Sequence, residues 1–438
     1  MTEALTKTGF DEEALAALPP ASPFVEGLRK RGLEDFRALP IPSQETEEWR
    51  YTDLSEFEFD LTPFAAGARA ETLDDVPEEI LAAVGHVGDR SGLQIQHNST
   101  VSITHLEPAL KGKGVLFTSL DEALAEHPEL VEDRLHAMVS PDRTKFTALH
   151  AAFLSGGTFV YVPRDVHVKL PLQTITYLDA EGLAVFPHTL VVLDQGAELT
   201  FIDRYVSPPL ARAFSDAVTE LYLGPNSRLR YVALQDWGEG MTHLSVQRAR
   251  IDRDAQLRTL GVAFGGSLSR AEVESVLEGD GGSSEMLGVY FGDGEQHIDH
   301  RSIQDHVGDR TSSDLLYKGA LKDRSAAIYT GTVIIEKDAH LCDAYQTNRN
   351  ILLSETARAH SVPNLEILTN DPTRCGHAAS VGPVDENELF YLQTRGIPRH
   401  EAVRLIVTGF FREVLDRVEI EEIRDTLEQA IEAEVATA

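Results

Sequence analysis

A spacing of about 28 residues in the central part of the chain constrains the fold more than any other feature of the sequence. A polar turn followed by a small residue recurs at intervals of 30, 28, 28, 29 and 27 residues, at Ala197, Ser227, Ala255, Ser283, Ser312 and Ala339. Short runs of β-branched and apolar residues flank these turns. Because each coil of a solenoid buries its apolar face only by stacking on its neighbours, this period predicts a β-solenoid. A large antiparallel sandwich, which also has regularly spaced turns, is the alternative.

Helical patterns lie on both sides of this β region. Short helices predicted at 11–18 and 118–136 indicate a mainly helical N-terminal domain over residues 1–153. The β region covers residues 154–384. Apolar residues at helical spacing then predict two helices in a C-terminal domain over residues 385–438.

Charge and composition exclude several classes of protein. The chain has 438 residues, and 39 Lys and Arg against 71 Asp and Glu give a net charge of −32. A field of this sign repels phosphate backbones and anionic lipid surfaces, so we expect neither nucleic acid nor membrane as a partner. The two cysteines cannot build a disulfide framework, and no apolar window is long enough to span a bilayer. These features predict a cytoplasmic protein.

The common catalytic motifs are absent from the sequence. It contains no GxxxxGK[ST] loop, no GxGxxG after a strand, no GxSxG elbow and no HExxH. We therefore expect a protein that is not an enzyme and that obtains any energy it needs from a partner.

Arg374-Cys375-Gly376-His377 is the sharpest local candidate for a metal site. Residues two apart on a strand point to the same face, so the thiol of Cys375 and the imidazole of His377 would project side by side, with Arg374 on the other face. Thiolate and imidazole suit zinc, iron and iron–sulfur chemistry. The alternative is a buried structural cysteine beside a hydrogen-bonded histidine, and Arg374 could hold the thiol ionised if it lay close enough in space.

Other candidates are weaker. His297, His300 and His306 alternate with two aspartates, but residues three apart on a strand face opposite sides, so we expect a polar strand and turn. Cys342 is expected to pack as a small hydrophobic residue. The C-terminal helical stripe exceeds what two short helices can cover, which predicts an exposed partner-binding surface that includes Val403, Val407, Phe410, Phe411 and Val414.

Several separate segments resemble one known family. They occur in the family's order along almost the whole chain: Glu47-Glu48-Trp49-Arg50-Tyr51-Thr52-Asp53-Leu54, Tyr317-Lys318-Gly319, Tyr345-Gln346-Thr347-Asn348-Arg349-Asn350, Pro363-Asn364-Leu365-Glu366-Ile367, Cys375-Gly376-His377 and Phe390-Tyr391-Leu392-Gln393-Thr394-Arg395-Gly396-Ile397. The chain thereby resembles the SufB/SufD scaffold subunits of the SUF iron–sulfur cluster assembly machinery. The Trp49 motif and the C-x-H motif resemble the D form. The sequence departs from the family pattern at Gly376, where Ser or Thr is frequent, and at Cys342.

The resemblance implies a mainly β fold, with a right-handed parallel β-helix between N-terminal and C-terminal helical domains. It also implies a complex with a SufB-like scaffold and a SufC-like ATPase that docks on the C-terminal helices. A transient iron–sulfur cluster or iron would be shared between the scaffolds, with His377 and Cys375 as ligands on this side. Flavin binding is left open.

Two alternative functions are kept. A SufB-like or homodimeric scaffold would receive sulfur itself and would differ in its choice of partner. A β-helix enzyme acting on polysaccharide would need a groove of clustered carboxylates or basic residues, and usually an export signal.

Overall fold

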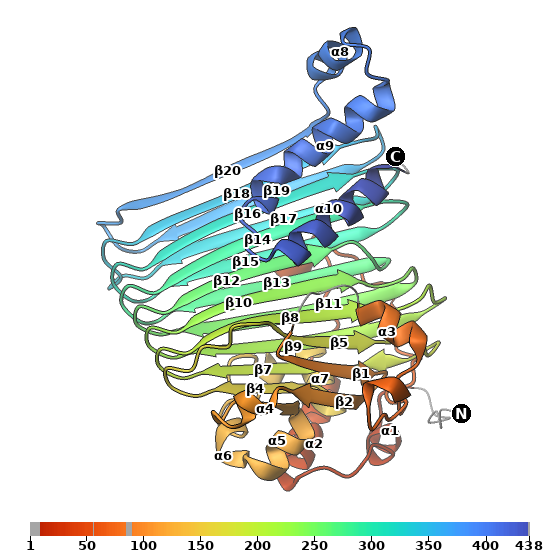
Figure 1. Ribbon diagram of the computed structural model, residues 1–438, viewed down its shortest axis with the longest axis vertical. Coiled ribbons are helices and arrows are strands. Elements are labelled where there is room, and N and C mark those ends of the chain that lie inside the picture. The colour runs from red at the N-terminus through yellow and green to blue at the C-terminus, as the bar shows by residue number, and fades with distance from the viewer. Residues whose placement is uncertain (1–8, 56, 85–89, 437–438) are drawn as a thin grey trace.

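Two large sheets, folded over one another, form the body of the molecule (Figure 1). The structure is a computed structural model that describes residues 9–55, 57–84 and 90–436, so residues 1–8 and 437–438 of the predicted terminal domains lie outside it. The chain winds between the sheets as a parallel β-solenoid of about eight turns with helices at both ends of the sequence. The predicted fold class is confirmed, and the antiparallel sandwich is excluded by the parallel pairing of the successive coils.

Each sheet contains one strand from every coil. The first sheet has the order β2 (Thr100–Leu106), β1 (Gly92–His97), β5 (Leu172–Tyr177), β8 (Glu198–Val206), β10 (Arg228–Asp236), β12 (Gln256–Ala263), β14 (Ser283–Gly292), β16 (Ser312–Leu321), β18 (Asp343–Leu352), β20 (Arg374–Pro383). The second has the order β19 (Arg358–Ile367), β17 (Ala326–Ile335), β15 (His297–His306), β13 (Leu268–Leu277), β11 (Met241–Ile251), β9 (Ala213–Leu223), β7 (His188–Leu193), β4 (Thr158–Val162), β3 (Leu116–Ser119), and β6 (Ala184–Val185) pairs with β9.

A stacked turn explains the sequence repeat. At one corner of successive coils a residue adopts a left-handed backbone, for example Asn226 at φ 59° and Asp254 at φ 57°. The next residue is small and buried, and the strand of the first sheet starts directly after it. The strand registers give this column as Ala197, Ser227, Ala255, Gly282, Thr311 and Cys342. Compared with this column, the repeat positions predicted from the sequence are one residue late at Ser283 and Ser312 and three residues early at Ala339.

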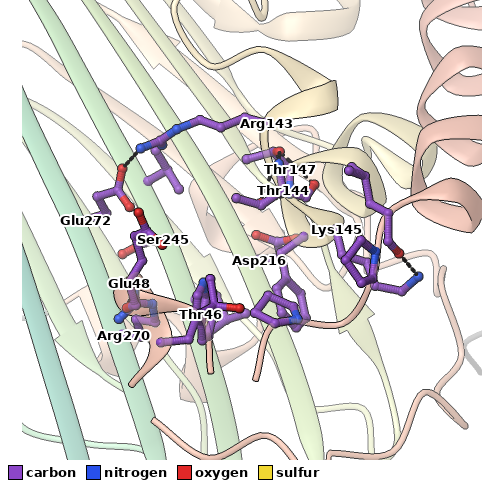
Figure 2. A pocket seen from close by; sticks show the side chains of 17 residues that line it. Thr46, Glu48, Arg143, Thr144, Lys145, Thr147, Asp216, Ser245, Arg270 and Glu272 are labelled. Carbon is purple, nitrogen blue, oxygen red and sulfur yellow. Dashed lines mark hydrogen bonds and ion pairs between the residues drawn. The ribbon is translucent and has the colours of Figure 1, made fainter. Parts of the chain in front are cut away.

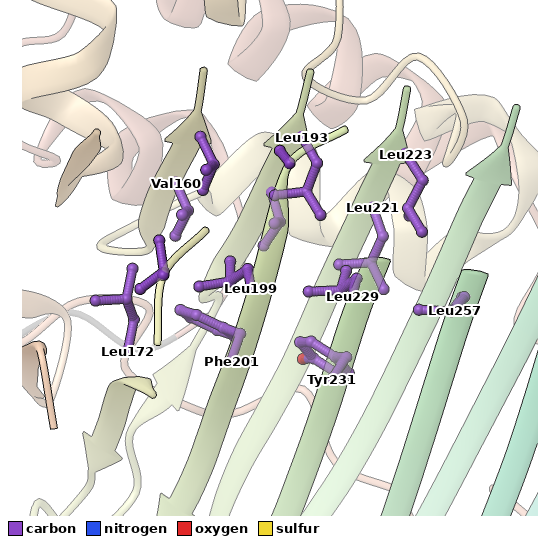
Figure 3. Packing of buried hydrophobic residues seen from close by; sticks show 14 of the residues in the cluster. Val160, Leu172, Leu193, Leu199, Phe201, Leu221, Leu223, Leu229, Tyr231 and Leu257 are labelled. Atoms are coloured by element: carbon purple, nitrogen blue, oxygen red, sulfur yellow. The ribbon is translucent and has the colours of Figure 1, made fainter. Parts of the chain in front are cut away.

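The interior between the sheets is built from equivalent residues on successive coils. Leu199, Leu229 and Leu257 lie in register on β8, β10 and β12, and all three are buried (Figure 3). Phe201 and Tyr231 form a second such column, with their rings stacked at 6.0 Å between centroids. Each coil thus buries its apolar side chains against the coil before and after it, which is the origin of solenoid stability.

The N-terminal region closes the first coil and contains strands that the sequence analysis missed. β1 and β2 extend the first sheet as an antiparallel hairpin, and β3 pairs antiparallel with β4 at the edge of the second. Leu106, Leu110 and Phe117 complete the apolar interior at this end. The helices and 3₁₀ segments around these strands are α1 (Glu12–Ala16), α2 (Pro23–Ala38), η1 (Glu47–Trp49), η2 (Leu73–Asp75), α3 (Glu78–Val84), α4 (Pro108–Lys111), α5 (Leu120–Glu126), α6 (Pro128–Val131), η3 (Pro141–Arg143) and α7 (Lys145–Phe153).

The C-terminal helices are α8 (Glu386–Thr394), α9 (Arg399–Leu415) and α10 (Glu421–Ala436). In Figure 1, α8 lies beyond the end of β20, and α9 and α10 run back across the outside of the first sheet. Among the described residues, no helix combines the length and the apolar character that a membrane span requires.

Candidate metal-binding edge of the solenoid

Strand β20 places Cys375 and His377 on the same face of the first sheet. Cys375 is paired with Ala344 and His377 with Gln346 on the preceding strand, β18, and both of these partners are buried. Arg374 lies on the other face, where its guanidinium donates to Asp343 Oδ1 at 2.7 Å and stacks on the ring of Tyr345. The C-x-H motif therefore presents a thiol and an imidazole together, with Arg374 turned away.

The two side chains differ in their surroundings. Cys375 is half-buried and packs against the apolar cluster that contains Val333, Ala344 and Cys342. This burial raises the pKa of the Cys375 thiol, so Arg374 does not keep it ionised. His377 is exposed and, within the described part of the chain, its ring makes no hydrogen bond or ion pair.

The edge that carries this pair is uncovered. β20 and β19 are the last strands of their sheets, so the outer side of each has no strand beside it within the described chain. Neither strand contains a buried residue, whereas β18 buries every second residue over most of its length. Ile367, Leu368 and Val381 expose about 40 to 57% of their surface here. An edge of this kind is a template for pairing with a strand of another chain.

Comparison with known proteins identifies the family. The family described as "SUF system FeS cluster assembly, SufBD core domain" matches residues 176–410 of the chain. The family described as "SufBD protein N-terminal region" matches residues 10–174. The chain belongs to the SufBD family. The iron–sulfur cluster assembly protein SufD of Bacillus subtilis is 32% identical over 442 residues, which cover 98% of this chain and 99% of the relative. A SufBD family protein of Mycobacterium tuberculosis is 37% identical over 289 residues, covering 64% of this chain and 72% of the relative.

These matches confirm the resemblance found in the sequence and make the chain a SufD-type member of an iron–sulfur cluster assembly family. The remaining residues singled out in the sequence can then be placed within a SufBD protein.

The N-terminal SufBD motif fastens a loop to the solenoid. Trp49 is buried, and the Arg270 guanidinium lies 4.0 Å from the centroid of its ring. Arg270 also forms a buried ion pair with Asp299, and Thr52 donates a 2.6 Å hydrogen bond to the same carboxylate. The motif therefore holds the segment around Trp49 against β13 and β15, a structural role.

The central SufBD motifs build the interior and anchor a helix. The Tyr290 hydroxyl donates to Asn350 Oδ1 at 2.6 Å and accepts from Asn348 Nδ2 at 3.0 Å. A side chain at Gly319 would collide with the Tyr290 ring, which explains the glycine. The neighbouring Lys318 is 3% exposed and donates to the Phe410 carbonyl in α9 at 2.7 Å.

The predicted exposure of the C-terminal stripe is contradicted for three of its five named residues. Val407, Phe411 and Val414 are fully buried, and Val403 and Phe410 are half-buried. They belong to an apolar cluster in which α9 and α10 pack on the outer face of the first sheet, and α9 itself contacts β14 and β16. The sheet supplies the apolar partner that two helices alone lack, so the buried members of the stripe cannot form a free surface.

The other histidine and cysteine candidates hold no metal site together. His300 packs among Tyr290 and Tyr317 inside the solenoid, while His297 contacts Thr52 on the other face. Each ring nitrogen of His306 lies 2.8 Å from a hydroxyl oxygen. Cys342 is buried in the turn column and contributes to an apolar cluster, as expected.

Sequence reasoning missed two features of the molecule. The first is a cavity of about 330 Å³ between residues 39–49, the start of α7 and the strands β9, β11 and β13 (Figure 2). Asp216 is among its lining residues, is 2% exposed and leaves its Oδ2 without a hydrogen bond. The second is a group of three buried histidines, His136, His150 and His188. Neither has a spacing signal, because their members come from elements far apart in the sequence.

We expect Asp216→Asn to stabilise the protein increasingly as the pH rises. Burial raises the pKa of the Asp216 carboxyl well above its ordinary value. Above about pH 4 the unfolded chain releases this proton while the native state retains it, so native stability falls with rising pH by about 1.4 kcal/mol per unit for this group. Asparagine removes that dependence. Denaturant unfolding of both proteins between pH 4 and 7 measures it, and parallel curves would contradict the prediction.

Proposed function

We propose that this chain is a non-catalytic scaffold subunit that assembles iron–sulfur clusters where its open end meets a second, homologous scaffold. The observation that carries the proposal is the position of Cys375 and His377 on the last, uncovered strand of the solenoid. Small residues dominate this strand, including Gly376, Ala378 and Ala379, so another backbone can approach it closely.

The number of ligands supports a shared site. A two-iron or four-iron cluster takes four protein ligands, and this edge offers one thiol and one imidazole. The remaining ligands would come from a SufB-like partner across the interface, or from a second copy of the chain when it is isolated. The cluster is the cargo of this assembly, and the proposal assigns it no resident cofactor and no flavin.

The state of the thiol favours a ligand over a sulfur acceptor. A cysteine that accepts sulfur attacks as its thiolate, and the raised pKa of Cys375 keeps more of it protonated. Coordination to iron displaces the proton instead. This favours a SufD-like role over the SufB-like alternative.

A SufC-like ATPase would supply the energy, because the sequence has no phosphate-binding loop. Its docking surface would use exposed apolar side chains of the C-terminal helices in place of the buried stripe. Phe390 and Tyr391 on α8 are 68% and 57% exposed, and Leu405 on α9 is 42% exposed. Aromatic side chains of this kind are typical anchors of protein interfaces. We place this complex in the cytoplasm.

Anaerobic cluster reconstitution on the complete complex tests the proposal. We expect His377→Ala to lower the cluster content at least about tenfold, since a ligand matters more than the outer contacts whose loss costs 10- to 100-fold. Cys375→Ala should have a smaller effect of the same sign. His340→Ala, which removes another exposed imidazole near this end, is the matched control. Full cluster content in His377→Ala, with the complex intact, would refute the assignment.

A further inference from the structure

Three histidines from separate elements meet beneath the N-terminal helices. His136 lies in the turn after α6, His150 in α7 and His188 at the start of β7, and all three are buried. Their ring centroids are 4.9 to 5.4 Å apart. One nitrogen of each ring lies within 4.8 Å of a nitrogen of each of the other two.

The hydrogen bonds fix where each ring carries its proton. His136 Nδ1 lies 2.9 Å from the Val139 carbonyl, and His150 Nε2 lies 3.2 Å from the Pro187 carbonyl. A carbonyl oxygen can only accept, so both nitrogens are donors. His188 Nε2 is 3.0 Å from the carboxylate of Glu220, which also accepts.

A neutral imidazole has one N–H nitrogen and one nitrogen with a lone pair. In each of the three rings, the nitrogen that does not donate to a carbonyl or carboxylate therefore carries the lone pair. Two of them, His136 Nε2 and His150 Nδ1, face each other at 3.2 Å. The third, His188 Nδ1, is buried without a hydrogen-bond partner. Facing lone pairs repel unless a proton or a cation lies between them.

We propose that His136, His150 and His188 bind a divalent transition-metal ion, zinc in the first instance, at a site separate from the Cys375–His377 edge. Zinc takes imidazole nitrogens at about 2.0 to 2.1 Å in a tetrahedron, which places two such nitrogens about 3.3 Å apart. The 3.2 Å between His136 Nε2 and His150 Nδ1 meets this requirement before any metal is added. A nitrogen of His188 lies within 4.8 Å of a nitrogen on each of the other two rings, so His188 can supply the third ligand.

Glu220 supplies the outer support that histidine metal sites typically have. Its carboxylate accepts from His188 Nε2 and from the backbone N–H groups of His136, Met138 and Val139, at 2.6 to 3.0 Å. This fixes the tautomer of His188 and places a negative charge beside the cation. The same three N–H bonds hold His136 at φ 59°, a conformation that is costly for a residue other than glycine.

The bound ion would tie the N-terminal helices to the first coils. His136 and His150 belong to the helical region, whereas His188 and Glu220 belong to β7 and β9 of the second sheet. A metal ligated from both sides would add its binding free energy to the folding of the joint between them.

Metal binding by the full-length protein tests this site, in a Cys375→Ser, His377→Ala background that removes the edge site. After chelator treatment, we expect about one Zn²⁺ per chain to bind and to raise the thermal midpoint by a few degrees. Co²⁺ should give the visible bands of a tetrahedral nitrogen site without a thiolate charge-transfer band. His150→Gln should abolish binding, and His243→Gln, which alters another buried histidine with an unpartnered Nδ1, should not.

Absence of tight Zn²⁺ or Co²⁺ binding by the background protein would overturn the proposal and leave a buried hydrogen-bond network. Equal binding by His150→Gln would overturn it too, by placing the metal elsewhere. If His150→Gln fails to fold, His188→Asn takes its place, and the cobalt spectrum of the background protein decides the ligand type independently of any variant. Reconstitution of the edge site is measured separately, so either proposal can fail alone.

Discussion

Replacing Asp203 by alanine is expected to lower the free energy of unfolding by about 4 kcal/mol. The Asp203 carboxylate lies inside the solenoid and accepts from four hydroxyl groups, those of Thr174, Thr189, Tyr205 and Tyr231, at 2.8 to 3.0 Å. Each buried donor that loses its acceptor costs about 1 to 3 kcal/mol, and the two tyrosines have a further hydroxyl nearby in Thr219, which lies 3.2 Å from the Tyr231 hydroxyl.

Denaturant unfolding measures this loss, and Asp203→Asn is the matched control. An amide of the same shape keeps one acceptor oxygen, and its NH₂ can donate to hydroxyls that reorient, so the loss should be clearly smaller. Burial is the main influence on this group and raises the pKa of Asp203, so the carboxyl also weakens the fold as pH rises above about 4. Equal stability of Asp203→Ala and wild type would contradict the network.

Val407→Asp is expected to destabilise the protein by more than about 3 kcal/mol and to cause aggregation. Val407 is fully buried between α9 and the first sheet, where an aspartate would have no charged or polar partner in the apolar cluster. Lifting α9 would also expose apolar side chains of β14 and β16, which promotes association between chains.

Leu405→Asp separates packing from partner binding on the same helix. Leu405 is two residues away from Val407 and is 42% exposed, so its substitution should change stability by about 0.5 kcal/mol or less. Thermal unfolding of both variants makes the comparison. Weaker binding of the proposed ATPase partner by a stable Leu405→Asp protein would support the exposed surface as the docking site. A folded, soluble Val407→Asp protein would show that α9 does not depend on the sheet.

The solenoid could be predicted because successive coils repeat the same types of residue at equivalent positions. A left-handed turn and a small buried residue recur at one corner of successive coils, and this pattern survives changes in the strands between. The exact register could not be predicted, because small residues such as Ser283 and Ser312 also start strands. β1 was missed because its six residues find their parallel partner, β5, only in a segment about 80 residues later.

Of the two candidate sites, the sequence predicts one and does not reveal the other. The pair Cys375 and His377 could be found because its members are two residues apart on one strand. His136, His150 and His188 come together only through tertiary packing, so no spacing announces them. The apolar stripe of α9 was correctly identified as a surface that must be covered. Periodicity shows that Val407 and Phe411 need an apolar neighbour, but it cannot tell whether that neighbour belongs to the same chain.

The two ends of the solenoid differ, and this difference decides which strand edges remain for further molecules once two have joined. The first coil is closed by antiparallel strands and by the apolar side chains Leu106, Leu110 and Phe117, while the last coil ends in the bare strands β19 and β20. A molecule that adds further copies through strand edges at both ends grows into a fibre, as stacked strands do in amyloid. At the N-terminal end the outermost strands, β2 and β3, are antiparallel to their neighbours, so they present a different edge from the parallel strands β19 and β20. Pairing between two C-terminal ends would therefore join two molecules and leave β2 and β3 as the outer edges of the pair. Growth beyond a pair would have to use these antiparallel strands.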